Sequence, residues 1–518
     1  MAKVCPESFT RTDPSQQFAK SDKIMIIEGE NIIITNGQSD ITVSQQIDNI
    51  FKYKVKPAFN NFDSVLVIFD DMDGKELKLT NSKRYPRLYE EVNLAMNDKI
   101  SDWDIIFKCP QNKMQFKSLF MQRILEKHRY ELQASQQIFL NGALEMDETL
   151  QCSNNSIADR ADIQLHIGES DTKIFQFVMQ TCEEFDNFVI QSSDSDVKIL
   201  ATYFQAKLTG KKICIKHGSG LIPAFYSPSL YLNYMSSNFC EEPLLKHAAS
   251  FLLTFLAFGC DSNPGFNGIS HGSAMMAFDR ISRVKSPQTE EDFLHLLADV
   301  YQGKYSGLKR HFTLQREAQL DERLLQTREV IKCFRGLESE TIPLQSVLHL
   351  QWLRTQYLFK TWTNPDDVEI LDPEDFGWKK EGDSKYSVIL QDKQDPHYSI
   401  PLSLLKGCSC KKKTCGKACS CKKDPNRSCC SSITCKFCQC FEENESVEDE
   451  DEEMEVLDNV DELEVFDDEF VVDGNIDEVE IFDEFDTAES GSSDDDDIEL
   501  ETVLERFHFT DEDKESFF

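Results

Sequence analysis

Four short acidic clusters in the first half of the chain consist of residue types that bind hard divalent cations. The first and third clusters follow the apolar runs SVLVIF and NFVI, the second opens a predicted helix, and the fourth follows an apolar helix. Several carboxylates in one place cannot all stay ionised without cations, and Mg²⁺ or Mn²⁺ favours such oxygen ligands. Two ions held together could clamp a scissile phosphate and activate water. The candidate residues are Asp70, Glu169, Asp171, Asp194, Asp196 and Asp261.

Each cluster alone also has a structural explanation. An Asp after a strand is an ordinary turn residue, and an acidic residue at a helix start is an ordinary cap. The order of the four clusters along the chain is what favours a shared site.

The elements around these clusters predict an α/β fold. Ser64–Phe69 is a continuous apolar run of strand length, as in a buried parallel strand. Strands that alternate with helices imply a parallel sheet, and ligands bind at the carboxyl edge of such sheets. Further strands are expected within 23–35, 187–190 and 212–215, and helices at 45–56, 113–140, 172–185, 196–208, 244–258 and 341–362.

Ten of the 18 cysteines lie between Cys408 and Cys440. Thiolates two or three residues apart can share one metal, and bridging sulfurs would let nine of them bind three zinc ions. The segment is almost without apolar residues, so metal binding must supply its folding free energy. A disordered or disulfide-linked tail is the alternative. The predicted zinc ligands are Cys408, Cys410, Cys415, Cys419, Cys421, Cys429, Cys430, Cys435, Cys438 and Cys440.

Basic residues fill the gaps between these cysteines, with Asp424 as the one acid among them. A positive surface on a metal-stiffened scaffold suits contacts to the phosphates of DNA or RNA. Alternatively, the basic residues only offset the charge of the bound thiolates. The residues expected to contact DNA are Lys411, Lys412, Lys413, Lys417, Lys422, Lys423 and Arg427.

The net charge of −37 is concentrated at one end of the chain. Residues 442–518 hold 36 Asp and Glu against Arg506 and Lys514, whereas residues 1–441 hold 56 acids against 53 bases. Such an acidic segment is expected to stay extended and disordered. Its interleaved Phe, Val and Ile would suit docking on a protein partner. Shielding of the basic cysteine segment is the alternative role.

We expect a soluble intracellular protein with reduced thiols and no membrane partner. Met1–Ile34 lacks the apolar core of a secretory signal, and the longest apolar run, Ala248–Gly259, is too short to span a bilayer.

The cysteine spacing from Cys408 to Cys421 resembles the tesmin-type CXC domain, a zinc-cluster module that binds DNA. The frame C-x-C-x4-C-x3-C-x-C matches without a gap. Ala418 stands where that family usually has an aromatic residue that contributes to base reading. The resemblance implies a zinc cluster, DNA contact and a nuclear location.

The order of the acidic clusters resembles that of the flap-endonuclease/PIN-like nuclease superfamily. In that superfamily a strand ending in Phe-Asp is followed along the chain by Glu-x-Glu, Asp-x-Asp and Gly-Cys-Asp. The corresponding motifs here are Phe69-Asp70, Glu169-Ser-Asp171, Asp194-Ser-Asp196 and Gly259-Cys260-Asp261. The resemblance implies a PIN-like parallel sheet and metal-binding catalytic roles for the six acids. It also implies that Gly268 and Ile269 lie in a turn that grips the DNA backbone.

One position departs from that family. Its first strand normally ends in an Asp metal ligand, and the run IIITNGQ offers Asn36 instead, which would weaken one metal site. The chain also resembles uncharacterised, transposon-associated animal proteins that pair a PIN-like domain with an Asp-Pro-Glu-Asp-x-Gly-Trp stretch, here Asp372–Trp378, and a terminal cysteine-rich module.

Two hypotheses follow. The chain is a divalent-metal-dependent DNA endonuclease, or it is a non-catalytic DNA- or chromatin-binding regulator that keeps a degenerate nuclease domain. The expected organisation is a disordered segment 1–22, a PIN-like domain 23–285, a helical extension and connector 286–400, a zinc module 401–441 and an acidic disordered tail 442–518.

Overall fold

The computed structural model describes one compact unit of the chain. Asn36, Gly268, the predicted zinc module and the acidic tail lie outside the described residues. The described residues are 5–34, 37–70, 91–142, 148–165, 169–217, 224–266, 269–305, 342–364, 371–381 and 386–389, with 320, 324, 327, 328 and 331.

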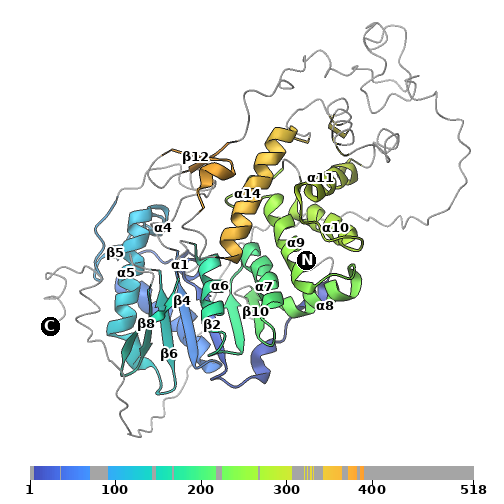
Figure 1. Ribbon diagram of the computed structural model, residues 1–518. Helices are drawn as coiled ribbons and strands as arrows, with labels where there is room; N and C mark the ends of the chain where they lie inside the picture. The colour runs from blue at the N-terminus through green and yellow to red at the C-terminus, as the bar shows by residue number, and fades with distance from the viewer. Residues whose placement is uncertain are drawn as a thin grey trace, which may run out of the picture. The chain divides into compact units, whose positions relative to one another are not determined.

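A nine-stranded sheet forms the centre of this unit (Figure 1). Five neighbouring strands run parallel, in the order β10-β9-β2-β4-β6, and antiparallel strands flank them. The α/β prediction is therefore confirmed. The parallel strands are β2 (Lys23–Glu28), β4 (Ser64–Ile68), β6 (Gln137–Asn141), β9 (Asn187–Gln191) and β10 (Lys212–His217). The flanking strands are β7 (Glu148–Ser153) and β8 (Ile157–Gln164) beside β6, and β11 (Ala224–Tyr226) and β1 (Phe9–Thr10) beside β10.

Helices cover both faces of the sheet, because the central strands are apolar on both sides. In β2, Ile24 and Ile26 belong to one buried cluster, whereas Met25 and Ile27 belong to the other. The helices of the first face are α6 (Ser170–Gln180), α7 (Ser195–Lys207), α8 (Pro228–Asn238) and α9 (Leu244–Ala257). Those of the second face are α1 (Gly29–Ile34), α2 (Val43–Ile50), α4 (Trp103–Lys108) and α5 (Pro110–Glu126).

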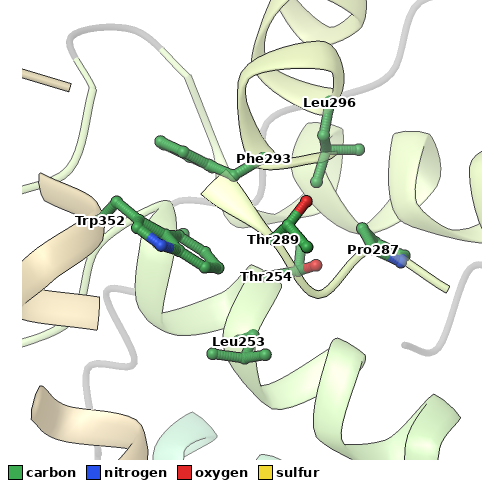
Figure 2. Close-up of a pocket in the computed structure, with 8 residues that line it drawn as sticks. Leu253, Thr254, Pro287, Thr289, Phe293, Leu296 and Trp352 are labelled. Carbon is green, nitrogen blue, oxygen red and sulfur yellow. The ribbon is translucent and has the colours of Figure 1, made fainter. Parts of the chain in front are cut away.

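Three further helices extend the core of the first face. They are α10 (His271–Ser282), α11 (Glu290–Lys304) and α14 (Gln345–Thr363). Leu253 and Thr254 of α9, Phe293 of α11 and Trp352 of α14 surround a small apolar cavity (Figure 2). Its volume of about 10 Å³ leaves room for a single water molecule at most, so it is a packing gap rather than a ligand site.

Three sequence predictions differ from the structure. Residues 5–22, expected to be disordered, include β1, which pairs with β11 at the sheet edge. Residues 31–34, expected to be a strand, form part of α1, since β2 already fills the centre of the sheet. The helix expected at 113–140 ends at Glu126, because residues 137–141 pair with β4 as β6.

Two short antiparallel pairs lie outside this sheet, β3 (Ile41–Thr42) with β5 (Lys99–Ile100), and β12 (Trp378–Lys380) with β13 (Tyr386–Val388). None of the helices described here combines the length and hydropathy needed to cross a bilayer.

Candidate functional site

The strand order creates a crevice at the carboxyl ends of the central strands. From β2 the chain proceeds to β4 and β6 on one side, and later to β9 and β10 on the other. Neighbouring strands whose connections leave in opposite directions open such a crevice, and ligands of α/β proteins bind there. Glu28 ends β2, Asp70 follows β4 and Asp194 follows β9, so three adjacent strands deliver acids to this edge.

Glu28 lies at the middle of this edge. Ser192 donates its hydroxyl proton to Glu28 Oε2 at 2.8 Å. Burial, together with the negative charges of Asp70, Glu30 and Asp194, raises the pKa of Glu28 to about 7, and the Ser192 hydrogen bond opposes this shift. These three carboxyl groups therefore lie within electrostatic reach of Glu28.

The prediction that the first strand ends at Asn36 is wrong, because that strand is β2 and it ends at Glu28. The missed signal is the strand-length run KIMII followed by Glu28-Gly29. A Cβ atom on Gly29 would lie 2.2 Å from the ring of Phe69, so glycine lets the ends of β2 and β4 pack together. An acidic residue thus occupies the position where sequence reasoning placed a neutral amide.

Asp70 contacts the start of α6, which carries the second acidic cluster. The backbone N–H of Ser170 donates to Asp70 Oδ1 at 2.7 Å. Glu169 is the residue that precedes α6, and Asp171 lies buried in its first turn. The positive end of the helix dipole favours negative charge at this place. The structure therefore brings Asp70, Glu169 and Asp171 together.

The third and fourth acidic clusters line one open cavity of about 350 Å³. Asp194 caps α7, where its Oδ1 accepts the backbone N–H of Asp196 at 2.9 Å. Asp261 and Cys260 line the cavity from the loop after α9, and His271 lines it from the start of α10. This cavity therefore gathers Asp194, Asp196 and Asp261.

Two observations connect the two groups of acids. Asp194 lines the cavity and also raises the pKa of Glu28. Burial, with the charges of Asp196 and Glu169, raises the pKa of Cys260, so Glu169 lies near the cavity wall. All six predicted acids thus lie along the same carboxyl edge of the sheet.

Lysines accompany these acids, and sequence reasoning did not place them. Lys117 of α5 is buried, pairs with Glu30 and donates to the backbone oxygen of Asp70 at 2.9 Å. Lys113, one turn earlier, lies 3.8 Å from Glu30 Oε1. Lys173 of α6 donates to the backbone oxygen of Phe69 at 3.2 Å. The spacing of four residues places Lys113 and Lys117 on one helix face but does not indicate which acids they meet.

One residue of the predicted DNA-contacting turn, Ile269, lines the cavity. Ser270 caps α10 by accepting the backbone N–H of Ser273 at 3.2 Å. His271 Nε2 lies 2.5 Å from the backbone oxygen of Gly259. Gly268 is outside the described residues, as are the predicted zinc ligands between Cys408 and Cys440 and the basic residues between Lys411 and Arg427.

The stretch Asp372–Trp378 is linked through Arg354 to the loop that carries Asp261. Gly377 adopts a left-handed conformation, with φ at 89°, and its oxygen accepts a hydrogen bond from Arg354 at 3.1 Å. Arg354, buried in α14, also donates to Asn263 Oδ1 at 3.0 Å. Asn263 belongs to the loop that carries Asp261. Arg354 therefore ties this loop to the Asp372–Trp378 stretch.

The described part of the chain is a mixed α/β protein with an acidic site at the switch point of its parallel strands. No protein-family model and no curated protein matches the chain. A solved structure of the catalytic core of Rad2 in complex with a DNA substrate is 14% identical, with a TM-score of 0.35, and the match covers 70% of this chain and 85% of that one.

A flap endonuclease of bacteriophage T5, solved with DNA and metal ions, is 13% identical with a TM-score of 0.25. The match covers 67% of this chain and 98% of that one. The T5 5′-exonuclease with bound zinc is also 13% identical, with a TM-score of 0.26 and coverage of 65% and 99%. The function proposed below depends on the residues of this chain rather than on these likenesses.

Proposed function

We propose that the body of this chain is a PIN-like, divalent-metal-dependent DNA phosphodiesterase. One observation carries the proposal, namely that Glu28, Asp70 and Asp194 meet at the carboxyl ends of three adjacent strands, next to a cavity lined by Asp196 and Asp261. The opening of this cavity gives a ligand access to the acids.

The donor set fits Mg²⁺ or Mn²⁺. All the groups are carboxylates, which are the hard oxygen ligands that these ions favour. Burial is the main cause of the raised pKa of Glu28, and the charges of Asp70, Glu30 and Asp194 add to it, so a bound cation would favour the ionised form. Divalent ions bound there would neutralise a phosphodiester and activate a water molecule.

The protein's own groups would position the acids and the nucleic acid. The first turn of α6 fixes Asp70, and the α7 cap fixes Asp194. Lys113 is only partly buried beside Glu30, so its charge can attract a phosphate approaching the site. The turn at Ile269 and Ser270 would contact the DNA backbone beside the cavity.

The C-terminal segments supply the rest of the proposal. A zinc cluster between Cys408 and Cys440 would present Lys411–Arg427 to DNA phosphates, as the CXC resemblance implies. The acidic residues 442–518 would dock on a protein partner or shield the basic surface. DNA binding by both parts supports a nuclear location.

A paired substitution tests the phosphodiesterase. The purified full-length chain should cleave branched or single-stranded DNA when Mn²⁺ is added, and Asp70→Asn should abolish cleavage and weaken Mn²⁺ binding. Asp63→Asn is the matched control, because Asp63 precedes the same strand at its opposite end. Equal activity of both variants, or an active chain without divalent ions, would contradict the proposal.

A specific observation favours the non-catalytic alternative. Lys117 places a fixed positive charge against Glu30 and the backbone of Asp70, which partly replaces a cation. In that case the chain binds DNA equally well with and without Mn²⁺, cleaves nothing, and Asp70→Asn leaves DNA binding unchanged.

A further inference from the structure

A second set of metal-ligating side chains lies outside the acidic site. Cys240 and Glu242 belong to the loop between α8 and α9, and His247 lies in the first turns of α9. One ligand atom from each of the three residues lies within 4.8 Å of the others. The described cysteines are all free thiols, so Cys240 is available as a ligand.

We propose that Cys240, Glu242 and His247 bind a zinc ion. A thiolate and an imidazole favour zinc over magnesium or manganese, which prefer ligand sets made only of oxygen. The thiolate and the carboxylate together balance the two charges of the ion. This matters because His247 is buried and Glu242 is only partly exposed.

Zinc binding requires a neutral imidazole, an ionised carboxyl group and a thiolate. Burial lowers the pKa of His247, and the hydrogen bond from Lys246 lowers the pKa of Glu242. Both directions agree with these requirements.

Hydrogen bonds already orient two of the ligands. The Ser286 hydroxyl lies 2.5 Å from His247 Nδ1, and Nε2 lies 3.0 Å from the backbone oxygen of Cys240. A backbone oxygen only accepts, so in this structure Nε2–H donates to Cys240 and the Ser286 hydroxyl donates to Nδ1. When zinc takes the place of the Nε2 proton, Nδ1 would carry that proton and donate it to Ser286, the usual supporting contact of a zinc-bound histidine.

Glu242 has one oxygen to offer. Its Oε1 pairs with Lys246 Nζ at 2.6 Å. Its Oε2 is buried near Ser286. The Lys246 side chain is 37% exposed, so its ammonium group can turn toward solvent when zinc takes up the carboxylate charge.

A zinc ion here would join three helical segments. The backbone N–H of Cys240 donates to the oxygen of Ser282 at the end of α10, at 3.0 Å. Ser286 belongs to the connection between α10 and α11. The ion would fix the α8–α9 loop against α9, and the contact of His247 with Ser286 would link both to this connection. Three protein ligands would leave one coordination position open to water.

Cysteine labelling of the native full-length chain tests this site separately from the predicted cluster at Cys408–Cys440. Iodoacetamide is added with zinc or with a chelator, and the peptide that contains Cys240 is quantified by mass spectrometry. We expect several-fold faster labelling of Cys240 when zinc is removed. Cys182 is the control, because it is half-buried and donates to the backbone oxygen of Met179.

Zinc content of full-length variants supplies the second measurement. Glu242→Gln should lower the zinc affinity of one site, and Cys240→Ser should remove one zinc per chain relative to the unsubstituted protein. Glu241→Gln makes the same charge change at the exposed neighbour and should leave the zinc content unchanged. If Cys240 is labelled at the same rate with zinc and with chelator, the proposal is overturned, whatever the variants do. His247 is then an ordinary buried histidine bonded to Ser286.

Discussion

Glu28 is the residue whose charge state should respond to pH within the physiological range. Its pKa is raised from 4.5 to about 7 by burial and by its acidic neighbours. Between these two values the folded protein binds a proton that the unfolded chain has released. Stability without metal therefore falls as pH rises through this window, and the contribution is level above about pH 7.

Glu28→Gln should remove this pH dependence, because an amide of the same shape stays neutral. Without added metal, the free energy of unfolding of the unsubstituted chain should fall between pH 5 and pH 8 by on the order of 3 kcal/mol relative to the variant. Urea unfolding followed by tryptophan fluorescence measures this difference. All four tryptophans, from Trp103 to Trp378, belong to the folded body that contains Glu28 and therefore report on its unfolding. Parallel pH profiles of the two proteins would contradict the assignment.

At the scale of the element, the turn after β6 supports the site through a glycine. Gly142 has φ at 86°, and a Cβ atom there would lie 2.1 Å from the backbone oxygen of Phe69. Gly210 has nearly the same φ, 85°, with nothing within 4 Å. Substitution of Gly210 would therefore introduce backbone strain alone. Substitution of Gly142 would introduce the same strain and also a collision with the residue before Asp70.

Gly210→Ala should lower the free energy of unfolding by about 1 kcal/mol, the cost of a left-handed alanine. Gly142→Ala should lower it by roughly 2–4 kcal/mol, because strain and overpacking add. Only Gly142→Ala should also weaken Mn²⁺ binding, since it displaces Phe69 beside Asp70. Equal effects of the two substitutions in urea unfolding and Mn²⁺ titration would show that the turn does not support the site.

Arg354 connects α14 with the loop that carries Asp261. It is 1% exposed, and burial lowers its pKa to about 10. Its partners within the described residues are the uncharged oxygens of Gln351, Asn263, Gly377 and Ile389. A lysine has no planar fork and cannot reach all four.

Arg354→Lys should therefore lower the free energy of unfolding by about 2–4 kcal/mol, because buried acceptors lose their donors. Arg280→Lys is the matched control, because Arg280 forms an exposed ion pair. This substitution should change the free energy of unfolding by less than about 0.5 kcal/mol. Thermal unfolding of the two variants compares these values. A stable Arg354→Lys protein would mean that the loop does not depend on this side chain.

The sequence predicted best those elements whose apolar residues fit only one kind of secondary structure. The apolar strands at 64–69 and 187–190, and the apolar helix at 244–258, fit one period and were placed correctly. The two apolar runs within residues 23–35 were ambiguous, since a short apolar run fits a strand or a buried helical turn. The pairing of β2 with both β4 and β9 decides this, and that long-range contact is not encoded locally.

The same limit explains which site groups were missed. The order of the acidic clusters pointed to one edge of the sheet. Glu30, Lys113 and Lys117 belong to helices whose position depends on packing against the second face, so their meeting with Asp70 could not be read from spacing.

For the whole molecule, charge distribution makes a prediction about DNA binding. Residues 442–518 carry 36 acidic residues and two basic ones. If they shield the basic cysteine segment, deletion of 442–518 should tighten DNA binding, most strongly at about 0.01 M salt, where the screening length is about 30 Å. Fluorescence anisotropy across a salt series measures this. A tail of equal length with neutral Gln and Asn is the control for bulk. Unchanged affinity at all salt concentrations leaves docking of a protein partner as the role of the tail.

The end of β4 is held from both faces of the sheet, which has a consequence for its local opening. The backbone oxygens of Phe69 and Asp70 accept bonds from Lys173 and Lys117, and the backbone N–H of Asp70 donates to Glu30 Oε2 at 3.1 Å. A peptide unit anchored by buried side chains on two sides should open only when the surrounding core does. Its amide hydrogen should therefore exchange with solvent as slowly as those inside β4. Glu30→Gln or Lys117→Met should speed hydrogen exchange at the Asp70 amide while the amides inside β4 still exchange slowly.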